Sequence, residues 1–235
     1  MQGGMLRHMI GPASGGNQMG RRSAQLKSTA GIAAALCMLS WSAGPAHSGT
    51  RGGDDSVMLF AGQASETNFM DIMVMPWAIE MNDIGVIGAS YAHRFGTVSE
   101  LVGDVLPGHI GDYLTVEAEG GTSFRFGDES LGEAWTALYL RYDNLPWNDT
   151  VYTTIGVNTG LSLLTDSSDF EAGRDSEGRS SKFLHYMGPE ITFADPNNKD
   201  LEFVFRLHHR SGVFGLFDDV VSGSTFLSTG IRIRF

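Results

Sequence analysis

The chain has 235 residues, and its 27 acidic residues outnumber its 16 lysines and arginines, which gives a formal net charge of −11. A chain this acidic is repelled by phosphate backbones, so its composition argues against nucleic acid as a partner. The only cysteine, Cys37, cannot form an internal disulfide, so the fold must be stable without such crosslinks.

Residues 1–48 contain no Asp or Glu and have the composition of an export signal. The parts follow in chain order: positive charge from Arg21, Arg22 and Lys27, an apolar core at residues 31–39, and small residues for cleavage at 44–46 or 46–48. The core is too short to span a bilayer, and Cys37 lies inside it. We predict a cleavable signal peptide over residues 1–48, starting at Met1 or Met19, and an exported domain over residues 49–235.

Segments of alternating polarity, separated by turn residues, follow the signal and predict strands. The eight predicted strands are residues 56–64, 83–95, 110–119, 133–142, 150–163, 183–193, 201–211 and 224–235. Pro189 has no backbone N–H, so we expect a bulge in the sixth strand. The Met-rich run 68–81 either lies along a membrane surface, extends the first strand or covers the end of the fold.

The seventh and eighth segments separate apolar from charged side chains most clearly. One face carries Leu201, Phe203, Phe205, Leu207, Ile231, Ile233 and Phe235, and the other carries Glu202, Arg206, His208, Arg210, Arg232 and Arg234. No apolar run long enough for a transmembrane helix occurs after residue 48, and an apolar edge strand at the chain end disfavours a soluble sandwich. We therefore predict an all-β fold, an eight-stranded antiparallel transmembrane β-barrel whose charged network fills the interior. Side chains fill a barrel of this size, which disfavours a transport pore.

The final residues Ile231-Arg232-Ile233-Arg234-Phe235 resemble the C-terminal signal that bacterial outer-membrane barrels present to their assembly machinery. We therefore expect Phe235 to engage that machinery and the chain to reside in the outer membrane of a Gram-negative bacterium. With the amino end in the periplasm, connections after odd-numbered strands lie outside the cell. The long loop 165–182 is one of them, and its Asp166, Asp169 and Glu171 are expected to form a solvated surface.

His209 and Ser211 continue the outward row of the seventh strand at its outer end. Side chains two apart on one face are neighbours, so an imidazole there can take a proton from the hydroxyl, as in acyl transfer. At the outer leaflet the available ester is the lipid A part of lipopolysaccharide. Alternatively, the two polar residues only mark the interface where the barrel meets lipid headgroups.

The eight-strand outline, Gly188-Pro189-Glu190 and His209-Arg210-Ser211 before a final strand ending in Phe resemble the lipid A 3-O-deacylase family. The resemblance implies an outer-membrane hydrolase that removes the 3-position acyl chain of lipid A and needs no cofactor. Ser211 would be its nucleophile and His209 its general base.

Two residues depart from the family pattern. The family has Asn after the serine, whereas Gly212 stands here and leaves only a backbone N–H for the oxyanion. The family's downstream Glu falls near Gly223, so Asp218 or Asp219 would have to orient His209. The alternative function is a non-catalytic barrel that serves as a surface scaffold or adhesin and keeps a relic His-x-Ser motif.

Overall fold

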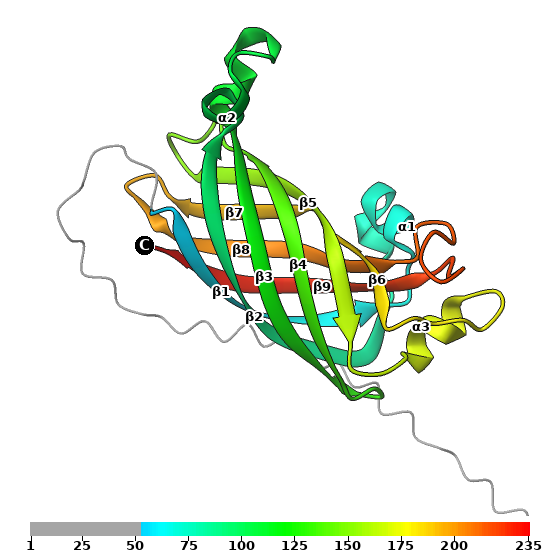
Figure 1. The fold of residues 1–235 in the computed structure, drawn as a ribbon. Helices are drawn as coiled ribbons and strands as arrows, with labels where there is room; N and C mark the ends of the chain where they lie inside the picture. The colour runs from blue at the N-terminus through cyan, green and yellow to red at the C-terminus, as the bar shows by residue number, and fades with distance from the viewer. Residues whose placement is uncertain (1–52) are drawn as a thin grey trace, which may run out of the picture. The chain divides into compact units, whose positions relative to one another are not determined.

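The computed structural model describes residues 53–235, so the predicted signal peptide lies outside the described residues. The described residues form one antiparallel sheet that curls into a barrel (Figure 1). The strands are β1 (Asp55–Ser65), β2 (Met81–Thr97), β3 (Leu114–Gly127), β4 (Leu131–Tyr142), β5 (Tyr152–Leu164), β6 (Phe183–Met187), β7 (Glu190–Asp195), β8 (Asn198–Ser211) and β9 (Gly223–Arg234).

The barrel closes because its first and last strands pair. β1 and β9 are antiparallel from the pair Ser56 and Arg234 to the pair Ala64 and Phe226. Both β6 and β7 lie between β5 and β8, so they are two halves of one interrupted strand. The nine segments therefore form a barrel of eight strands. The predicted eight-stranded antiparallel barrel is confirmed, and closure removes the exposed edges.

The sixth strand of the barrel is interrupted between β6 and β7, at Gly188 and Pro189, where the proline predicted an irregularity. A Cβ at Gly188 would overlap the carbonyl oxygen of Leu207 on β8, so only glycine permits this close approach. The carbonyl of Pro189 accepts a hydrogen bond from Leu207 N at 3.0 Å, which restores pairing directly after the break. The register is the same on both sides of the break, since Met187 lies opposite His209 and Glu190 lies opposite Arg206. No extra residue is inserted, so the strand is interrupted at Pro189 but the bulge expected there was wrong.

The prediction for the third strand was wrong at both ends. Residues 107–113 form the short helix η2 (Pro107–Tyr113), and β3 runs on to Gly127 through Gly120 and Gly121. These glycines do not end the strand because Gly121 makes room for Trp135, its neighbour on β4, whose ring a Cβ at 121 would overlap. The other predicted strands agree with the structure to within three residues at each end.

The barrel has an apolar wall and a charged interior, the reverse of a soluble protein. Outward residues such as Leu59, Ile87, Leu138, Val157, Phe203 and Ile231 are exposed. The buried inward rows hold Glu117, Glu119, Glu133, Glu190, Glu202, Arg125, Arg141, Arg206, Arg210, Arg232 and Arg234. Phe235 is 64% exposed, so the chain does not end inside a soluble core. This arrangement requires lipid around the wall.

The interior charges neutralise one another, as predicted for His208, Glu202, Arg206 and Arg210. Arg206 Nη1 donates to Glu119 Oε1 at 2.7 Å, and Arg232 Nη1 donates to Glu202 Oε2 at 2.7 Å. His208 Nε2 lies 2.9 Å from Glu133 Oε1. Buried charges are tolerated only when paired in this way, so the interior is a packed polar core.

Five short helices lie in the connections between strands. They are α1 (Phe69–Val74), η1 (Pro76–Ala78), α2 (Val98–Val102), η2, and α3 (Asp169–Arg174). We call the end of the barrel with Asp55, Phe235, α2 and η2 the terminal end, and the opposite end, with α1, α3 and the β8–β9 connection, the loop end (Figure 1). No helix among residues 53–235 is long and apolar enough to cross a membrane.

One acidic loop residue does not lie on a solvated surface as predicted. Glu171 of α3 is fully buried, and its Oε1 accepts a hydrogen bond from Arg210 Nη1 at 2.7 Å. Arg125 Nη2 also lies 3.4 Å from its Oε1. The loop folds into the mouth of the barrel because two inward arginines there need a counter-charge.

Candidate functional site

His209 and Ser211 occupy the last turn of the outward row on β8, at the loop end. Their neighbours His208 and Arg210 are fully buried in the interior, so His209 and Ser211 face away from it. Both are half-buried, although Phe203 and Phe205 on the same row are exposed to the surroundings of the wall. The outward placement expected from alternation is what the structure has.

A threonine on the last strand orients the imidazole of His209. Thr225 of β9 lies directly opposite His209, and Thr225 Oγ1 is 2.8 Å from His209 Nδ1. The ring also stacks on Phe69 at the start of α1, with centroids 4.5 Å apart and planes 22° apart. These contacts direct the other ring nitrogen, Nε2, away from Thr225. When the hydroxyl accepts the Nδ1 proton, Nε2 carries the lone pair that a general base needs.

The carboxylates expected to orient His209 have other places in the structure. Asp218 accepts a hydrogen bond from Ser181 Oγ, and neither Asp218 nor Asp219 is bonded to His209 among the described residues. Both aspartates have positive φ, 51° and 57°, in the tight β8–β9 connection. The groups that orient the imidazole are therefore the hydroxyl of Thr225 and the backbone of Ser224, which also forms a hydrogen bond with it. Sequence reasoning missed them because the register of β8 on β9 was not known.

Ser211 is not hydrogen-bonded to His209 in this conformation. Its Oγ accepts the backbone N–H of Val213 at 3.1 Å, a bond that a serine commonly makes at the end of a strand. Catalytic hydrogen bonds often form only when substrate is bound, so adjacency on one row is the relevant geometry. Val213 N–H is also a backbone donor placed beside the candidate nucleophile.

Gly212 does not offer the oxyanion donor expected of it. Its N–H donates to the carbonyl of Ser222 at 3.1 Å, so it is engaged within the β8–β9 connection. A Cβ at Gly212 would overlap the carbonyl oxygen of Val220. Glycine stands here because two backbone segments approach closely, and a side chain of asparagine size does not fit this conformation.

A second imidazole, which sequence reasoning missed, lies beside Ser211. His185 of β6 is the cross-strand partner of Ser211, and its Nε2 is 2.9 Å from Thr159 Oγ1. Its Nδ1 is buried and has no hydrogen-bond partner among residues 53–235, which is uncommon for a polar atom. The signal was present in the alternation of Phe183, His185 and Met187, which puts His185 on the outward row.

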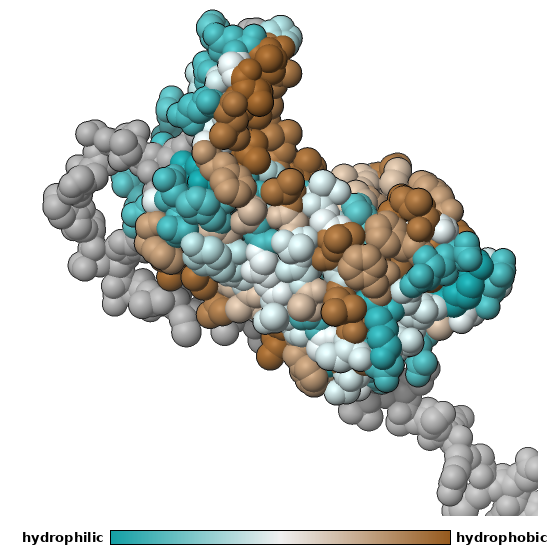
Figure 2. Space-filling model, in the orientation of Figure 1, coloured by the Kyte–Doolittle hydropathy of each residue, from teal (hydrophilic) through white to brown (hydrophobic). Residues whose placement is uncertain are grey.

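Apolar residues surround this polar cluster at the loop end. Met70, Met73, Val74 and Trp77 of the α1–η1 segment and Phe214, Leu216 and Val221 of the β8–β9 connection are exposed. Figure 2 shows hydrophobic side chains gathered over the α1 region of this end. The hydroxyl and imidazole groups therefore lie within an apolar rim, a setting that suits an amphiphile with a polar ester.

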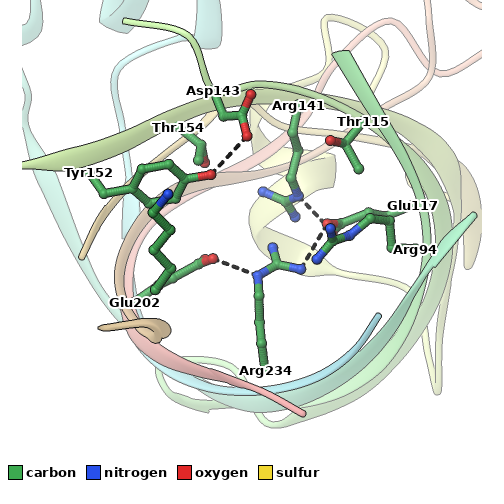
Figure 3. A pocket seen from close by; sticks show the side chains of 10 residues that line it. Arg94, Thr115, Glu117, Arg141, Asp143, Tyr152, Thr154, Glu202 and Arg234 are labelled. Carbon is green, nitrogen blue, oxygen red and sulfur yellow. Dashed lines mark hydrogen bonds and ion pairs between the residues drawn. The ribbon is translucent and has the colours of Figure 1, made fainter. Parts of the chain in front are cut away.

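A separate recess opens into the interior at the terminal end (Figure 3). Glu117 pairs there with Arg141 and Arg234, at 2.7 and 2.9 Å, and Glu202 also pairs with Arg234. Its volume is about 20 Å³, room for about one water. The recess is the charged end of the interior core and carries no arrangement suited to acyl transfer.

Comparisons with known proteins agree on the fold. The chain matches no family model, and no curated protein matches it in sequence. The outer membrane enzyme PagL is similar in structure at 12% identity, over 77% of this chain and 99% of that one, with a TM-score of 0.51. Neisserial surface protein A (11% identity, 79% and 100% coverage, TM-score 0.43) and the N-terminal β-barrel domain of Pseudomonas aeruginosa OprF (9%, 79% and 100%, 0.42) are more distant. At 12% identity the likeness to PagL shows the fold alone. A closed barrel with an apolar wall of this kind is the architecture of transmembrane barrels in bacterial outer membranes.

Proposed function

We propose that this outer-membrane barrel is an ester hydrolase that removes an acyl chain from the lipid A part of lipopolysaccharide. The observation that carries the proposal is the arrangement of Thr225, His209 and Ser211 on the lipid-facing side of the loop end. Thr225 Oγ1 holds His209 Nδ1 at 2.8 Å, and Ser211 is the next residue on the same row. The sequence resemblance to lipid A 3-O-deacylases points to the same two residues.

The mechanism follows from these positions. His209 Nε2 takes the proton from Ser211 Oγ as Oγ attacks the ester carbonyl, and the resulting imidazolium then protonates the departing sugar oxygen. Water attacks the acyl-serine in the second half, with His209 again as base, and releases the fatty acid. Val213 N–H takes the place of Gly212 as oxyanion donor, and to do so it exchanges its bond to Ser211 Oγ, at 3.1 Å, for one to the carbonyl oxygen of the ester.

The position of the site selects the substrate class. Its polar groups face lipid, and the apolar rim of α1 and the β8–β9 connection suits acyl chains. With the amino end in the periplasm, the loop end lies at the outer leaflet, where the ester-bearing lipid is lipopolysaccharide. Phe235 at the terminal end is then on the periplasmic side, where it would meet the barrel-assembly machinery.

Mass spectrometry of lipid A from cells that produce the protein tests the proposal. We expect loss of one hydroxyacyl chain with the unaltered chain and full-length lipid A with Ser211→Ala or His209→Ala. Thr229→Val is the matched control, because Thr229 lies on the same outward face of β9 but opposite Phe205, away from the site. Unchanged lipid A with a correctly folded, unaltered barrel would refute the hydrolase.

A non-catalytic surface barrel is the second candidate, and two observations favour it. Ser211 is bonded to Val213 rather than to His209, and the N–H of Gly212 is engaged by Ser222. In such a protein His209, Ser211 and His185 would only line the interface with lipid headgroups. Lipid A of unchanged mass in cells with the folded barrel would support this candidate.

A further inference from the structure

The connection between β2 and β3 is a small structured element at the terminal end. Its first helix, α2, begins with a capping box in which Glu100 N donates to Thr97 Oγ1 at 3.2 Å and Thr97 N donates to Glu100 Oε2 at 2.7 Å. η2 packs closely on α2: Gly111 lies so near Ser99 that a Cβ at position 111 would overlap the Ser99 hydroxyl. Figure 1 shows this segment projecting beyond the ends of β2 and β3. The connection therefore has a defined shape and is not a loose turn.

This element, which we call the rim helices (residues 98–113), is amphipathic. Its exposed apolar side chains are Leu101, Val102, Val105, Leu106, Ile110 and Tyr113. Its exposed polar side chains include Glu100, Asp104 and Asp112. In Figure 2 the protruding segment at the top is hydrophobic along one edge and hydrophilic along the other, and the hydrophobic edge is on the side of the loop end. A contiguous apolar edge of this kind indicates a surface that is covered in the native setting.

The neighbouring strand indicates what covers this edge. The outward row of β2 ends with Tyr91, His93 and Phe95. Tyr91 and Phe95 are 50% and 52% exposed on the lipid-facing wall. Aromatic residues at this position form the girdle at which a barrel wall meets the boundary between bilayer and water. α2 begins three residues after Phe95, so the apolar edge of the rim helices continues the wall at the level of that boundary.

We propose that the rim helices lie on the bilayer surface at the terminal end, with Val102, Val105 and Leu106 inserted among phospholipid acyl chains. Asp104 and Asp112 then remain in water on the opposite edge. Short amphipathic elements bind membranes in this way, by burying an apolar face at the boundary between headgroups and acyl chains. The contact would hold the depth and tilt of the barrel in the leaflet. It lies at the opposite end from Ser211, so it holds or fails independently of the proposed hydrolase.

Site-specific fluorescence tests the proposal. The chain, with Cys37→Ser so that the new thiol is the only one, is folded into vesicles of phosphatidylethanolamine and phosphatidylglycerol. An environment-sensitive NBD probe is attached through Val105→Cys, and the matched control carries it through Asp104→Cys, the adjacent exposed residue on the polar edge. Val102→Cys provides a second position on the apolar edge. All three positions are exposed, so the barrel is expected to fold in each variant.

The proposal predicts that the probes at 105 and 102 shift their emission to the blue and are quenched by lipids with a nitroxide just below the headgroup. The probe at 104 is expected to keep the emission of water and to escape quenching. Water-like emission from all three positions would overturn the proposal. Blue emission at 105 that lipid nitroxides do not quench, and that rises with protein density in the vesicles, would also overturn it by showing that a second copy covers this edge.

Discussion

Replacing Glu171 with glutamine tests whether the α3 loop is held in the barrel mouth by charge. Both carboxylate oxygens of Glu171 receive Arg210 Nη1, at 2.7 and 2.8 Å, and Oε1 also accepts from Ser224 Oγ at 2.7 Å. Glu171, Arg210 and Ser224 are all buried. Glu171→Gln keeps the shape of the side chain and removes its charge, so it isolates the electrostatic contribution.

The expected loss follows from what each arginine keeps. Breaking one side of a buried ion pair costs about 3–5 kcal/mol. Arg125 retains Glu129 and Glu133, each at 3.2 Å, whereas the nearest remaining carboxylate to Arg210 is Glu133 at 3.9 Å. Only Arg210 is left without a close carboxylate, and its guanidinium still donates to the carbonyl of Lys182 at 2.9 Å, so we expect a loss near the lower bound, about 3 kcal/mol. Adding Arg210→Met removes the orphaned charge and should restore part of the stability.

Urea unfolding of the barrel in lipid vesicles, followed by tryptophan fluorescence, gives the free energy of unfolding. The matched control is Glu177→Gln in the same loop, because Glu177 pairs with Arg179 at 3.3 Å in an exposed position. Exposed pairs contribute about 0–1 kcal/mol, so the control should change the stability little. If Glu171→Gln lowers the free energy of unfolding no more than the control does, the α3 loop is not held by this buried charge.

Three further predictions concern the loop end. Thr225→Val keeps the shape of the side chain but removes the hydrogen bond to His209 Nδ1. Loss of a neutral hydrogen bond worth about 1.4 kcal/mol should lower the deacylation rate in single-turnover assays roughly tenfold. An unchanged rate would exclude Thr225 as an orienting group. Gly212→Asn, which installs the residue of the deacylase family, should lower activity and raise protease cleavage of the β8–β9 connection, because its Cβ overlaps the carbonyl of Val220; a gain of activity would contradict this. The N–H groups of Val221, Glu177 and Ser222 lower the pKa of Asp175 to about 2. The hydrogen bond from Val221 N–H to the Asp175 carboxylate is therefore fully present above the usual carboxyl pKa of about 4 and is lost as pH falls through about 2. The NMR chemical shift of the Val221 amide should change with a midpoint near pH 2, as Asp175 is protonated. A midpoint near 4 would show that the hydrogen bond between Val221 and Asp175 is absent.

The barrel and its inside-out character could be predicted because alternation is local. In β9, Arg232 and Arg234 were expected to face inward and Ile231 and Ile233 outward, and the structure agrees. The same period placed His209 and Ser211 on the outward row. A strand turns successive side chains to opposite faces whatever its neighbours are, so these assignments need no knowledge of pairing.

Other local signals pointed the wrong way. Gly120 and Gly121 resemble a turn, yet β3 continues through them because the space above Gly121 holds the ring of Trp135. Glu171 lies in a stretch rich in Asp, Ser and Gly that is typical of a solvated loop, yet it is buried. In both cases the deciding partner is a side chain from a different segment.

The amino-acid sequence alone therefore sets which side chains share a face of each strand, the number of strands and the interruption at Pro189. Each of these follows from the geometry of consecutive residues. It does not set the partners of the candidate site. Thr225 meets His209 and His185 meets Ser211 through the register of three strands, and Glu171 reaches Arg210 across 39 residues of chain. Such contacts exist only after the barrel closes, because closure sets the register and leaves the interior charges that a loop must then neutralise.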